Sequence, residues 1–543
     1  MPKSDPDFLI VGSGAAGSIM AKELADAGFN VLVLEQGPHL HERDFKHDEL
    51  KNNWQSALTN DQRTQPNTFR SNDQEVAKPG MAVQYGRCVG GGTVHFTGNY
   101  WRFREIDFNE ASKKGAIAGT GFADWPLTYA ELEPYYTKAE WELGVSGQAG
   151  LSPGESFRSK PYPMPPLPVK SSGVLAERAA KKLGWHAFPA PMAILSENYR
   201  GRPACVHCGF CESFGCEVGA KSSTLAALIP GALKTGRCEI RADCYVRKIE
   251  TNGAGRATGV IYFDLAKRQH MQRAKAVIVC CNGAETPRLL LLSASKHFPN
   301  GLANNSGMVG KHLMFTSGAF CGGLFEHPLN EYKSVQVSRV IHDFYEIDPK
   351  LGFYGGGGLD TRFDFYPISF GLGALPPDLP KWGAGYKEAL REYFTRSMFV
   401  LAHATSLPVP TNTVSLDPKL KDAWGVPALR VTYRDHADDI KTSQFFSDRA
   451  MELLDAAGAT KKWAFPVEAQ TWSNHLLGTC RMGNDPKTSV VDKQHRAHDV
   501  KNLFIVDGSS FVTSGRGQPT CTIQALAYRA ADEISALARR GGI

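Results

Sequence analysis

The stretch Phe8-Leu-Ile-Val-Gly12-Ser-Gly14-Ala-Ala-Gly17 decides the fold, together with Val31-Leu-Val-Leu-Glu35 downstream of it. Residues 8–11 are apolar and suit a buried parallel strand, and apolar residues at helical spacing follow the glycines. A second apolar strand then ends in an acid. The order strand, glycines, helix, strand and acid predicts a Rossmann-like unit that binds a dinucleotide.

Each glycine of this unit has its own role. Gly12 allows a tight turn, Gly14 with Ala15 beside it lets the backbone approach a pyrophosphate, and Gly17 lets the helix pack on the strand. The N-terminus of the helix offers free N–H groups to the phosphates. Glu35 is placed to accept hydrogen bonds from a ribose 2′-OH, and an acid at this position disfavours NADP.

Four further segments have related features. Gly86–Asn99 is a second glycine-rich loop, and Val277–Leu290 is another strand, turn and helix. His475-Leu-Leu-Gly-Thr-Cys-Arg-Met-Gly483 follows, and Asn502-Leu-Phe-Ile-Val-Asp507-Gly508 ends a strand with an acid. These five motifs, in this order, resemble the glucose–methanol–choline (GMC) oxidoreductases from near the first residue to near the last.

The resemblance implies bound FAD, oxidation of an alcohol and two domains. The expected fold class is α/β, with a discontinuous Rossmann-like FAD-binding domain at residues 1–300 and 471–543. An α+β substrate-binding domain with an antiparallel sheet is expected at residues 301–470. Beyond the first motif, the cofactor-binding residues that the resemblance implies are Gly90, Gly91, Thr93, His95, Asn99, Asp507, Gly508, Pro519 and Thr520.

Local patterns refine this organisation. Residues 161–168 contain five prolines and predict an extended surface connector. Residues 355–358 are all glycine and indicate a flexible or tightly turned segment. Alternating apolar and polar residues at 412–416 and 429–433 predict antiparallel strands.

Oxidation of a carbinol needs a base for the hydroxyl proton, and a neutral histidine suits that role. Among sixteen histidines, His475 matches the catalytic position of the family and is the candidate base. Gln518 stands where relatives have His or Asn, and its amide can orient the substrate but cannot be a second base. Alternatively, Gln518 fills space while Asn474 or Asn99 orients the substrate.

Two other histidines invite a functional interpretation. His95 is at the position where some relatives, similar to pyranose oxidase, bond a histidine to the flavin 8α-methyl, while others keep the histidine without the bond. His403, just before a predicted strand, could contact sugar hydroxyls or be structural.

The run Cys205-Val-His-Cys208-Gly-Phe-Cys211-Glu-Ser-Phe-Gly-Cys216 carries four thiols in twelve residues. A disulfide would close almost no loop here, and structural zinc usually takes two cysteine pairs separated by a longer loop. The single tight wrap favours an iron–sulfur cluster, while four reduced structural thiols remain the alternative.

This run resembles the large subunits of bacterial sugar dehydrogenases, which carry a three-iron (3Fe-4S) cluster held by three cysteines. Cys205, Cys211 and Cys216 match best, with Cys208 extra, so three or four ligands are open. Electrons would then pass from FAD to an external acceptor such as a cytochrome c. Such relatives reach the periplasm by co-export with a small subunit that bears the signal, so we expect these partners and that location, with the cytoplasm as the alternative.

Composition excludes other classes. The net charge of +6 on 543 residues has no concentrated basic run, so nucleic acid is not an expected partner. No apolar stretch reaches the about 20 residues that span a bilayer, and the glycine motif begins too early to leave room for a cleavable signal peptide.

The leading hypothesis is therefore a dehydrogenase of a sugar or glycoside, glucoside C3 oxidation included. A family oxidase that passes electrons to O₂, with structural cysteines, is the alternative. A lyase that uses the flavin domain as a scaffold is a third possibility.

Overall fold

The computed structural model describes residues 5–543, and one end of the molecule is organised around a five-stranded parallel sheet built from distant parts of the chain. The strand order is β18-β10-β1-β2-β6. The strands are β1 (Phe8–Val11), β2 (Val31–Leu34), β6 (Cys238–Arg241), β10 (Ala276–Val279) and β18 (Leu503–Ile505). β1 is fully buried and pairs in parallel with both β10 and β2, which explains its unbroken apolar sequence.

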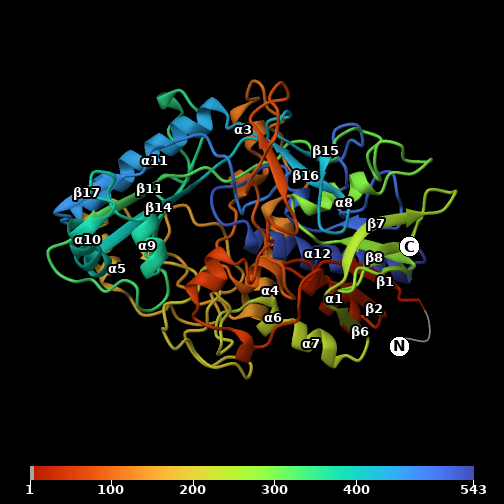
Figure 1. Ribbon diagram of the computed structural model, residues 1–543, viewed down its shortest axis with the longest axis horizontal. Coiled ribbons are helices and arrows are strands. Elements are labelled where there is room, and N and C mark those ends of the chain that lie inside the picture. The colour runs from red at the N-terminus through yellow and green to blue at the C-terminus, as the bar shows by residue number, and fades with distance from the viewer. Residues whose placement is uncertain (1–4) are drawn as a thin grey trace.

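Helices cover this sheet. α1 (Gly17–Asp26) follows the glycine motif and packs against α12 (Thr520–Arg539) and α7 (Ile229–Lys234). α12 also packs against α4 (Tyr129–Leu143), so the last helix of the chain lies beside the first, as Figure 1 shows. The first and last segments of the sequence therefore build one core.

A six-stranded antiparallel sheet forms the other end of the molecule, at the left of Figure 1. Its order is β17-β11-β14-β13-β12-β5. The strands are β5 (Ala187–Pro189), β11 (Phe320–Leu324), β12 (Val337–Ile341), β13 (Gly357–Arg362), β14 (Ser397–Ala404) and β17 (Lys461–Ala464). The long helices α11 (Ala437–Ala456) and α5 (Ser171–Leu183) pack against each other and against this sheet.

Two smaller sheets complete the strands. One has the order β15-β16-β3-β4, from β3 (Asn67–Arg70), β4 (Lys78–Pro79), β15 (Thr413–Lys421) and β16 (Pro427–Thr432). The other is β7 (Tyr245–Thr251), β8 (Ala257–Phe263) and β9 (Gln269–Arg273). The remaining helical elements are η1 (Glu42–Asp44), η2 (Leu50–Trp54), η3 (Gly91–Val94), α2 (Glu105–Phe108), α3 (Glu110–Lys114), α6 (Thr224–Ala227), α8 (Glu285–Leu292), η4 (Pro349–Leu351), α9 (Pro367–Gly373), α10 (Gly383–Arg396) and η5 (Gly508–Ser510).

The predicted fold class is confirmed, since a parallel sheet with helices is joined to an antiparallel sheet. The antiparallel pair predicted at 412–416 and 429–433 is β15 and β16. The domain limits at residues 300 and 471 stay a prediction. In the structure β5 adds to the antiparallel sheet and β3 pairs with β16, so chain before residue 300 contributes to both of these sheets.

Two local expectations were wrong. The glycines at 355–358 do not form a flexible turn, because Gly357 and Gly358 begin the buried strand β13. A Cβ at Gly357 would lie 2.1 Å from the His403 carbonyl oxygen, so close packing explains the glycine. His403 lies within β14 rather than before a strand.

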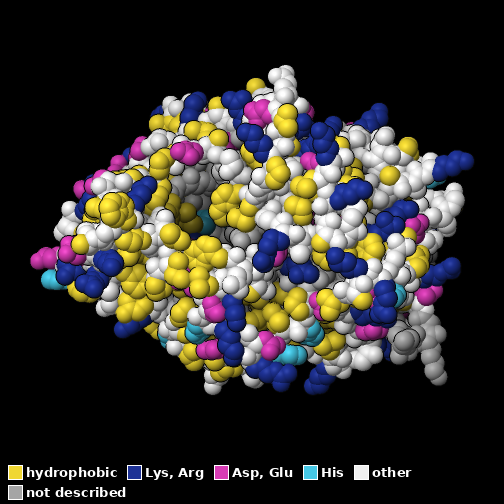
Figure 2. Space-filling view, in the orientation of Figure 1, with side chains coloured by type: hydrophobic (Ala, Val, Ile, Leu, Met, Phe, Trp, Pro, Cys, Tyr) yellow, Lys and Arg dark blue, Asp and Glu magenta, His cyan; other side chains and the backbone are white. Residues whose placement is uncertain are grey.

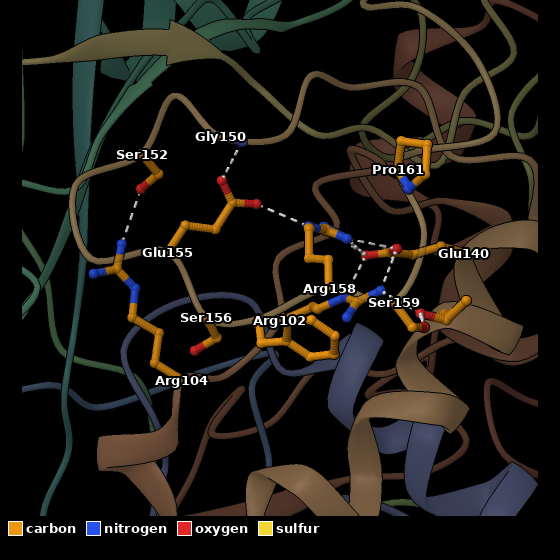
Figure 3. Close-up of polar contacts among 12 residues, drawn as sticks. Arg102, Arg104, Glu140, Gly150, Ser152, Glu155, Ser156, Arg158, Ser159 and Pro161 are labelled. Carbon is orange, nitrogen blue, oxygen red and sulfur yellow. Dashed lines mark hydrogen bonds and ion pairs between the residues drawn. The ribbon is translucent and has the colours of Figure 1, made fainter.

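The proline-rich connector is held by buried ion pairs near residues 150–159, drawn in Figure 3. Arg102 Nη2 and Arg158 Nη1 lie 2.7 and 2.8 Å from the same Glu140 oxygen, Oε2, on α4. Arg158 also pairs with Glu155, and Arg104 donates to Ser152 Oγ at 2.9 Å. The predicted surface connector is thus anchored at its start. Among residues 5–543, no helix is both long and apolar enough to cross a membrane.

Candidate active site

A cavity of about 550 Å³ lies between the parallel and antiparallel sheets and is lined by residues from both. Figure 2 shows a hollow in the surface with a histidine side chain inside it. The cavity collects most of the residues predicted from the sequence. Those that line it are Gly12, Gly14, Ala15, Glu35, Gly91, Thr93, His95, Asn99, Asn474, His475, Asp507, Gly508, Gln518, Pro519 and Thr520. Gly17, Gly90 and the four clustered cysteines do not line it.

One end of the cavity is a backbone cradle. Gly12 has φ +93°, and a Cβ at Gly17 would lie 2.0 Å from the Gly12 carbonyl oxygen, so neither position accepts a side chain. A Cβ at Gly91 would lie 2.7 Å from Gly14 Cα. The two glycine-rich loops therefore contact each other at the N-terminus of α1, where the phosphates of a dinucleotide would meet free N–H groups.

Glu35 lies at the end of β2 beside this cradle. Its carboxylate accepts from Ser13 N and Oγ at 3.0 and 2.8 Å and from Gly37 N at 3.0 Å. Burial raises the pKa of Glu35, and the three donors oppose that rise. Asp507, after β18, accepts from Thr286 Oγ1 at 2.5 Å and Ser509 N at 2.8 Å. Both acids thus stand where strands of the parallel sheet end, which fits a bound FAD.

The second loop carries polar atoms that lack partners. His95 follows η3, and its Nε2 has no hydrogen-bond partner among residues 5–543. Burial, followed by the charge of Lys221, lowers the pKa of His95 to about 4, so the ring is neutral at pH 7. The Asn99 side chain donates from Nδ2 to Asp360 Oδ2 at 3.1 Å. Its Oδ1 accepts no hydrogen bond from residues 5–543. These unpartnered atoms suit a polar ligand in the cavity.

His475 is held at the cavity wall by two hydroxyls. Its Nδ1 forms a short hydrogen bond with Thr316 Oγ1, and its backbone N–H donates to Ser473 Oγ at 3.0 Å. Burial lowers the pKa of His475 to about 3, and the charges of His403 and Arg362 add to this effect. The imidazole is therefore neutral at pH 7 and available as a base.

Gln518 approaches a buried polar network that the sequence did not reveal. Its Nε2 lies 3.0 and 3.1 Å from the two ring nitrogens of His403. His403 Nε2 lies 2.9 Å from Asp360 Oδ2, which pairs with Arg362 at 2.6 Å. Asp360 and Arg362 are two residues apart on β13 and share a face of the strand. That i, i+2 pair of opposite charges was the signal that the sequence offered for this network.

The cysteine run is a loop beside the cavity. All twelve cysteines of the chain are free thiols; among the clustered four, Cys208 is exposed and Cys211 is buried. Burial, against the opposing charge of Lys221 and with a smaller contribution from the other three thiols, raises the pKa of Cys211 to about 12. However, no three His, Cys, Asp or Glu side chains in the described part of the chain are arranged to hold a metal ion. The predicted iron–sulfur site thus stays a prediction.

Known proteins share this architecture. Sequence profiles for GMC oxidoreductases match residues 6–315 and 408–527. The chain is 36% identical to a 2-methyl-1,2-propanediol dehydrogenase of Mycolicibacterium austroafricanum, covering 97% of this chain and 95% of that protein. It is 32% identical to the fructose dehydrogenase large subunit of Gluconobacter japonicus, covering 97% of both.

Solved structures agree on the fold alone. A formate oxidase of Aspergillus oryzae superposes with a TM-score of 0.67 at 16% identity, covering 99% of this chain and 100% of that one. Pyridoxine 4-oxidase of Mesorbium loti superposes with a TM-score of 0.65 at 18% identity, covering 97% of this chain and 98% of that one. The sequence matches agree with the glycine cradle, the two acids at strand ends and the buried histidine. They show that the chain belongs to the GMC oxidoreductase family and is an FAD-dependent dehydrogenase acting on CH–OH groups.

Proposed function

We propose that this enzyme oxidises a secondary or primary hydroxyl of a sugar, glycoside or similar small polyol, glucoside C3 included, and passes the electrons to an external acceptor. The observation that carries the proposal is His475, a neutral imidazole fixed by Thr316 on the wall of the cavity that also holds the glycine cradle. FAD, when bound, supplies the acceptor for the hydride of the carbinol carbon.

His475 takes the hydroxyl proton. When Nδ1 carries the proton and donates to Thr316 Oγ1, Nε2 is left to accept from the substrate O–H. Removing that proton as the C–H bond breaks avoids a protonated carbonyl, and a positioned base of this kind is worth about 10²–10⁴ in rate. Thr316 thus holds the ring in place and can accept from the tautomer that acts as a base.

Other polar side chains that line the cavity suit a substrate with several hydroxyls. Ser317 Oγ and Asn99 Oδ1 are buried, line the cavity and have no partner among residues 5–543. Gln518 is oriented by His403, so its amide carbonyl is left to accept from a substrate hydroxyl. An alcohol with a single hydroxyl would leave these atoms unpaired, at a cost of about 1–3 kcal/mol each. The names of the two relatives, a fructose and a propanediol dehydrogenase, support this class.

For the electron acceptor, we propose a three-iron cluster held by Cys205, Cys211 and Cys216, with a cytochrome c beyond it. The support is four free thiols on one loop beside the cavity, with Cys208 exposed at the surface. Such a cluster would supply one-electron transfer. Co-export with a signal-bearing small subunit and a periplasmic location belong to the same proposal. The subunit name of the fructose dehydrogenase relative supports an assembly.

The test is an anaerobic titration of the FAD-loaded protein with fructose, glucosides and small diols. We expect the flavin absorbance to bleach with a polyol in the wild-type protein, and about 10²–10⁴-fold more slowly in His475→Gln. An unchanged rate in His475→Gln would contradict the assigned base. Peroxide formed in air at the rate of substrate oxidation would support an oxidase instead, and bleaching by no substrate would support a lyase.

Iron analysis and EPR of the same preparation test the electron route separately. About three iron atoms per chain, lost in a Cys211→Ser variant, are expected. Zinc in place of iron, or a metal-free loop in protein produced under iron-replete conditions, would contradict the cluster while leaving the dehydrogenase intact.

A further inference from the structure

Lys221 is a buried ammonium group that lies between two functional loops. Lys221 is only 2% exposed. Its Nζ lies 3.0 Å from Phe96 O, 2.5 Å from Cys211 O and 2.7 Å from Phe214 O. Three carbonyl acceptors use three N–H donors, which a charged lysine has and a neutral amine does not. Burial lowers the pKa of Lys221 from its usual value, and the nearby thiols and Glu212 oppose that fall. The three carbonyl acceptors match the charged form.

This charge has no ordinary partner. No carboxylate among residues 5–543 forms an ion pair with Lys221, and the same is true of the neighbouring Arg202. Arg202 donates instead to Leu143 O at 2.5 Å and to Gly219 O at 3.4 Å. Burying an unpaired cation is costly, so two of them beside one loop require a functional reason.

Lys170 shows the usual alternative in the same chain. It is also buried and also donates to two carbonyl oxygens, of Glu331 and Val335, at 2.5 and 2.9 Å. Unlike Lys221, it has a carboxylate, Glu331, at 3.3 Å. What distinguishes Lys221 is therefore its surroundings, in which the loops of the flavin cavity and the cysteines replace the carboxylate.

The three carbonyls belong to two loops that the lysine joins. Phe96 follows His95 in the glycine-rich loop of the cavity, and Cys211 and Phe214 belong to the cysteine loop. The backbone adds a second tie, because Ser213 N donates to His95 O at 2.7 Å. Lys221 N also donates to Cys216 Sγ at 3.4 Å. Lys221 thus contacts the backbone of both the glycine-rich loop and the cysteine loop.

We propose that Lys221 is a positioning residue that clamps the cysteine loop to the flavin loop and places a fixed positive charge between the flavin cavity and the thiols. The charge reaches the cavity, since it contributes to the lowered pKa of His95 on the cavity wall. A positive charge there stabilises the extra negative charge of a reduced flavin and of an anionic sulfur centre. The inference rests on the FAD dependence of the proposed function and not on the iron–sulfur part.

The test is the midpoint potential of the bound FAD, measured by spectroelectrochemical titration of the loaded protein. We expect Lys221→Met to shift the potential to more negative values, because the reduced flavin loses a favourable charge. Lys221→Arg keeps the charge and should stay near the wild-type potential. Lys170→Met removes another buried lysine, whose charge acts on Cys211 but not on His95 of the cavity wall, and should leave the potential unchanged. A wild-type potential in Lys221→Met would overturn the proposal.

A second measurement reports on the clamp without using the flavin. In FAD-free protein, backbone hydrogen exchange of the cysteine-loop peptide, residues 205–216, read by mass spectrometry, should be faster in Lys221→Met than in the wild type or Lys170→Met. Should Lys221→Met fail to fold, Lys221→Gln removes the charge and takes its place in both measurements. Equal exchange rates in all variants would exclude the clamp. Iron content tests the cluster proposal independently of both results.

Discussion

At the scale of single residues, burial selects the neutral form of several histidines. His475 and His403 both have a lowered pKa because their rings are desolvated beside the Arg362 guanidinium. A base that is neutral over the whole physiological range does not need to lose a proton before it reacts. The same environment makes the protonated form after reaction a strong acid, which favours rapid release of the proton.

His495 offers a clean measurement of this effect on stability. Its ring is fully buried, neither nitrogen has a partner within residues 5–543, and burial lowers its pKa to about 3. The unfolded chain binds a proton near pH 6.5, so the stability contributed by the neutral ring is present above that pH and is lost as the pH falls toward 3. By pH 4.5 this one group costs about 3 kcal/mol.

We therefore expect His495→Asn to be less stable than the wild type at pH 8 because of the cavity it creates. The gap in urea midpoint should narrow as the pH falls from 6.5 to 4.5. Asparagine tolerates the positive φ of 62° at this position, so backbone strain does not confuse the comparison. A gap that is the same at both pH values would show that His495 titrates normally.

At the scale of elements, the loop between η5 and α12 is fixed by a buried ion triad. Arg516 pairs with Asp107 of α2 at 2.6 Å and forms a short contact with Glu110 of α3, and all three side chains are buried. Gln518 follows two residues later, so the triad also sets where that amide lies. The Arg516 triad thus fixes both the start of α12 and the position of Gln518 beside His403.

Arg516→Met would leave two buried carboxylates without their cation. We expect the free energy of unfolding to fall by about 3–5 kcal/mol, measured by urea denaturation of the FAD-loaded protein. The matched control is Arg268→Met, which breaks an exposed pair with Asp264 and should cost at most about 1 kcal/mol. Similar losses in the two variants would mean that the triad does not hold the loop.

The elements also show what the sequence could predict. β1, α1 and β2 follow from the local order of apolar residues, glycines and acid, because these signals act within a few tens of residues. The pairing of β3 with β16 and the addition of β5 to the antiparallel sheet depend on contacts between distant segments, which no local pattern encodes.

The candidate site divides in the same way. His475 and Gln518 were found through motifs, and both line the cavity. Thr316, Asp360 and Arg362 were missed. The opposite charges two residues apart indicate a pair, but only folding brings them beside His403, which the sequence had marked as a possible contact for sugar hydroxyls. Lys221 was missed for the same reason, since nothing in sequence marks a lysine as buried.

At the scale of the whole molecule, the cavity lies where the two large sheets meet, so FAD binding should stabilise both. A ligand present at 1,000 times its dissociation constant adds about 4 kcal/mol to the folded state. We expect the FAD-free protein to unfold at a lower temperature than the loaded protein by calorimetry, and the difference to grow with FAD concentration. ADP, which can fill only the cradle, should recover part of the gain. An unfolding temperature that FAD does not change would contradict the assigned cofactor site.

The parallel sheet has a consequence for how the chain is made. Its edge strand β18 begins at Leu503, and α12, which covers α1, ends at Arg539 of 543 residues. During synthesis the first strands therefore wait on the ribosome with one edge and one face of their sheet exposed. Those surfaces are sites for chaperone binding and for misassociation between nascent chains. Asp507, Pro519 and Thr520 also line the cavity, so the cofactor site is complete only after this part of the chain has been made and has folded onto β1 and α1.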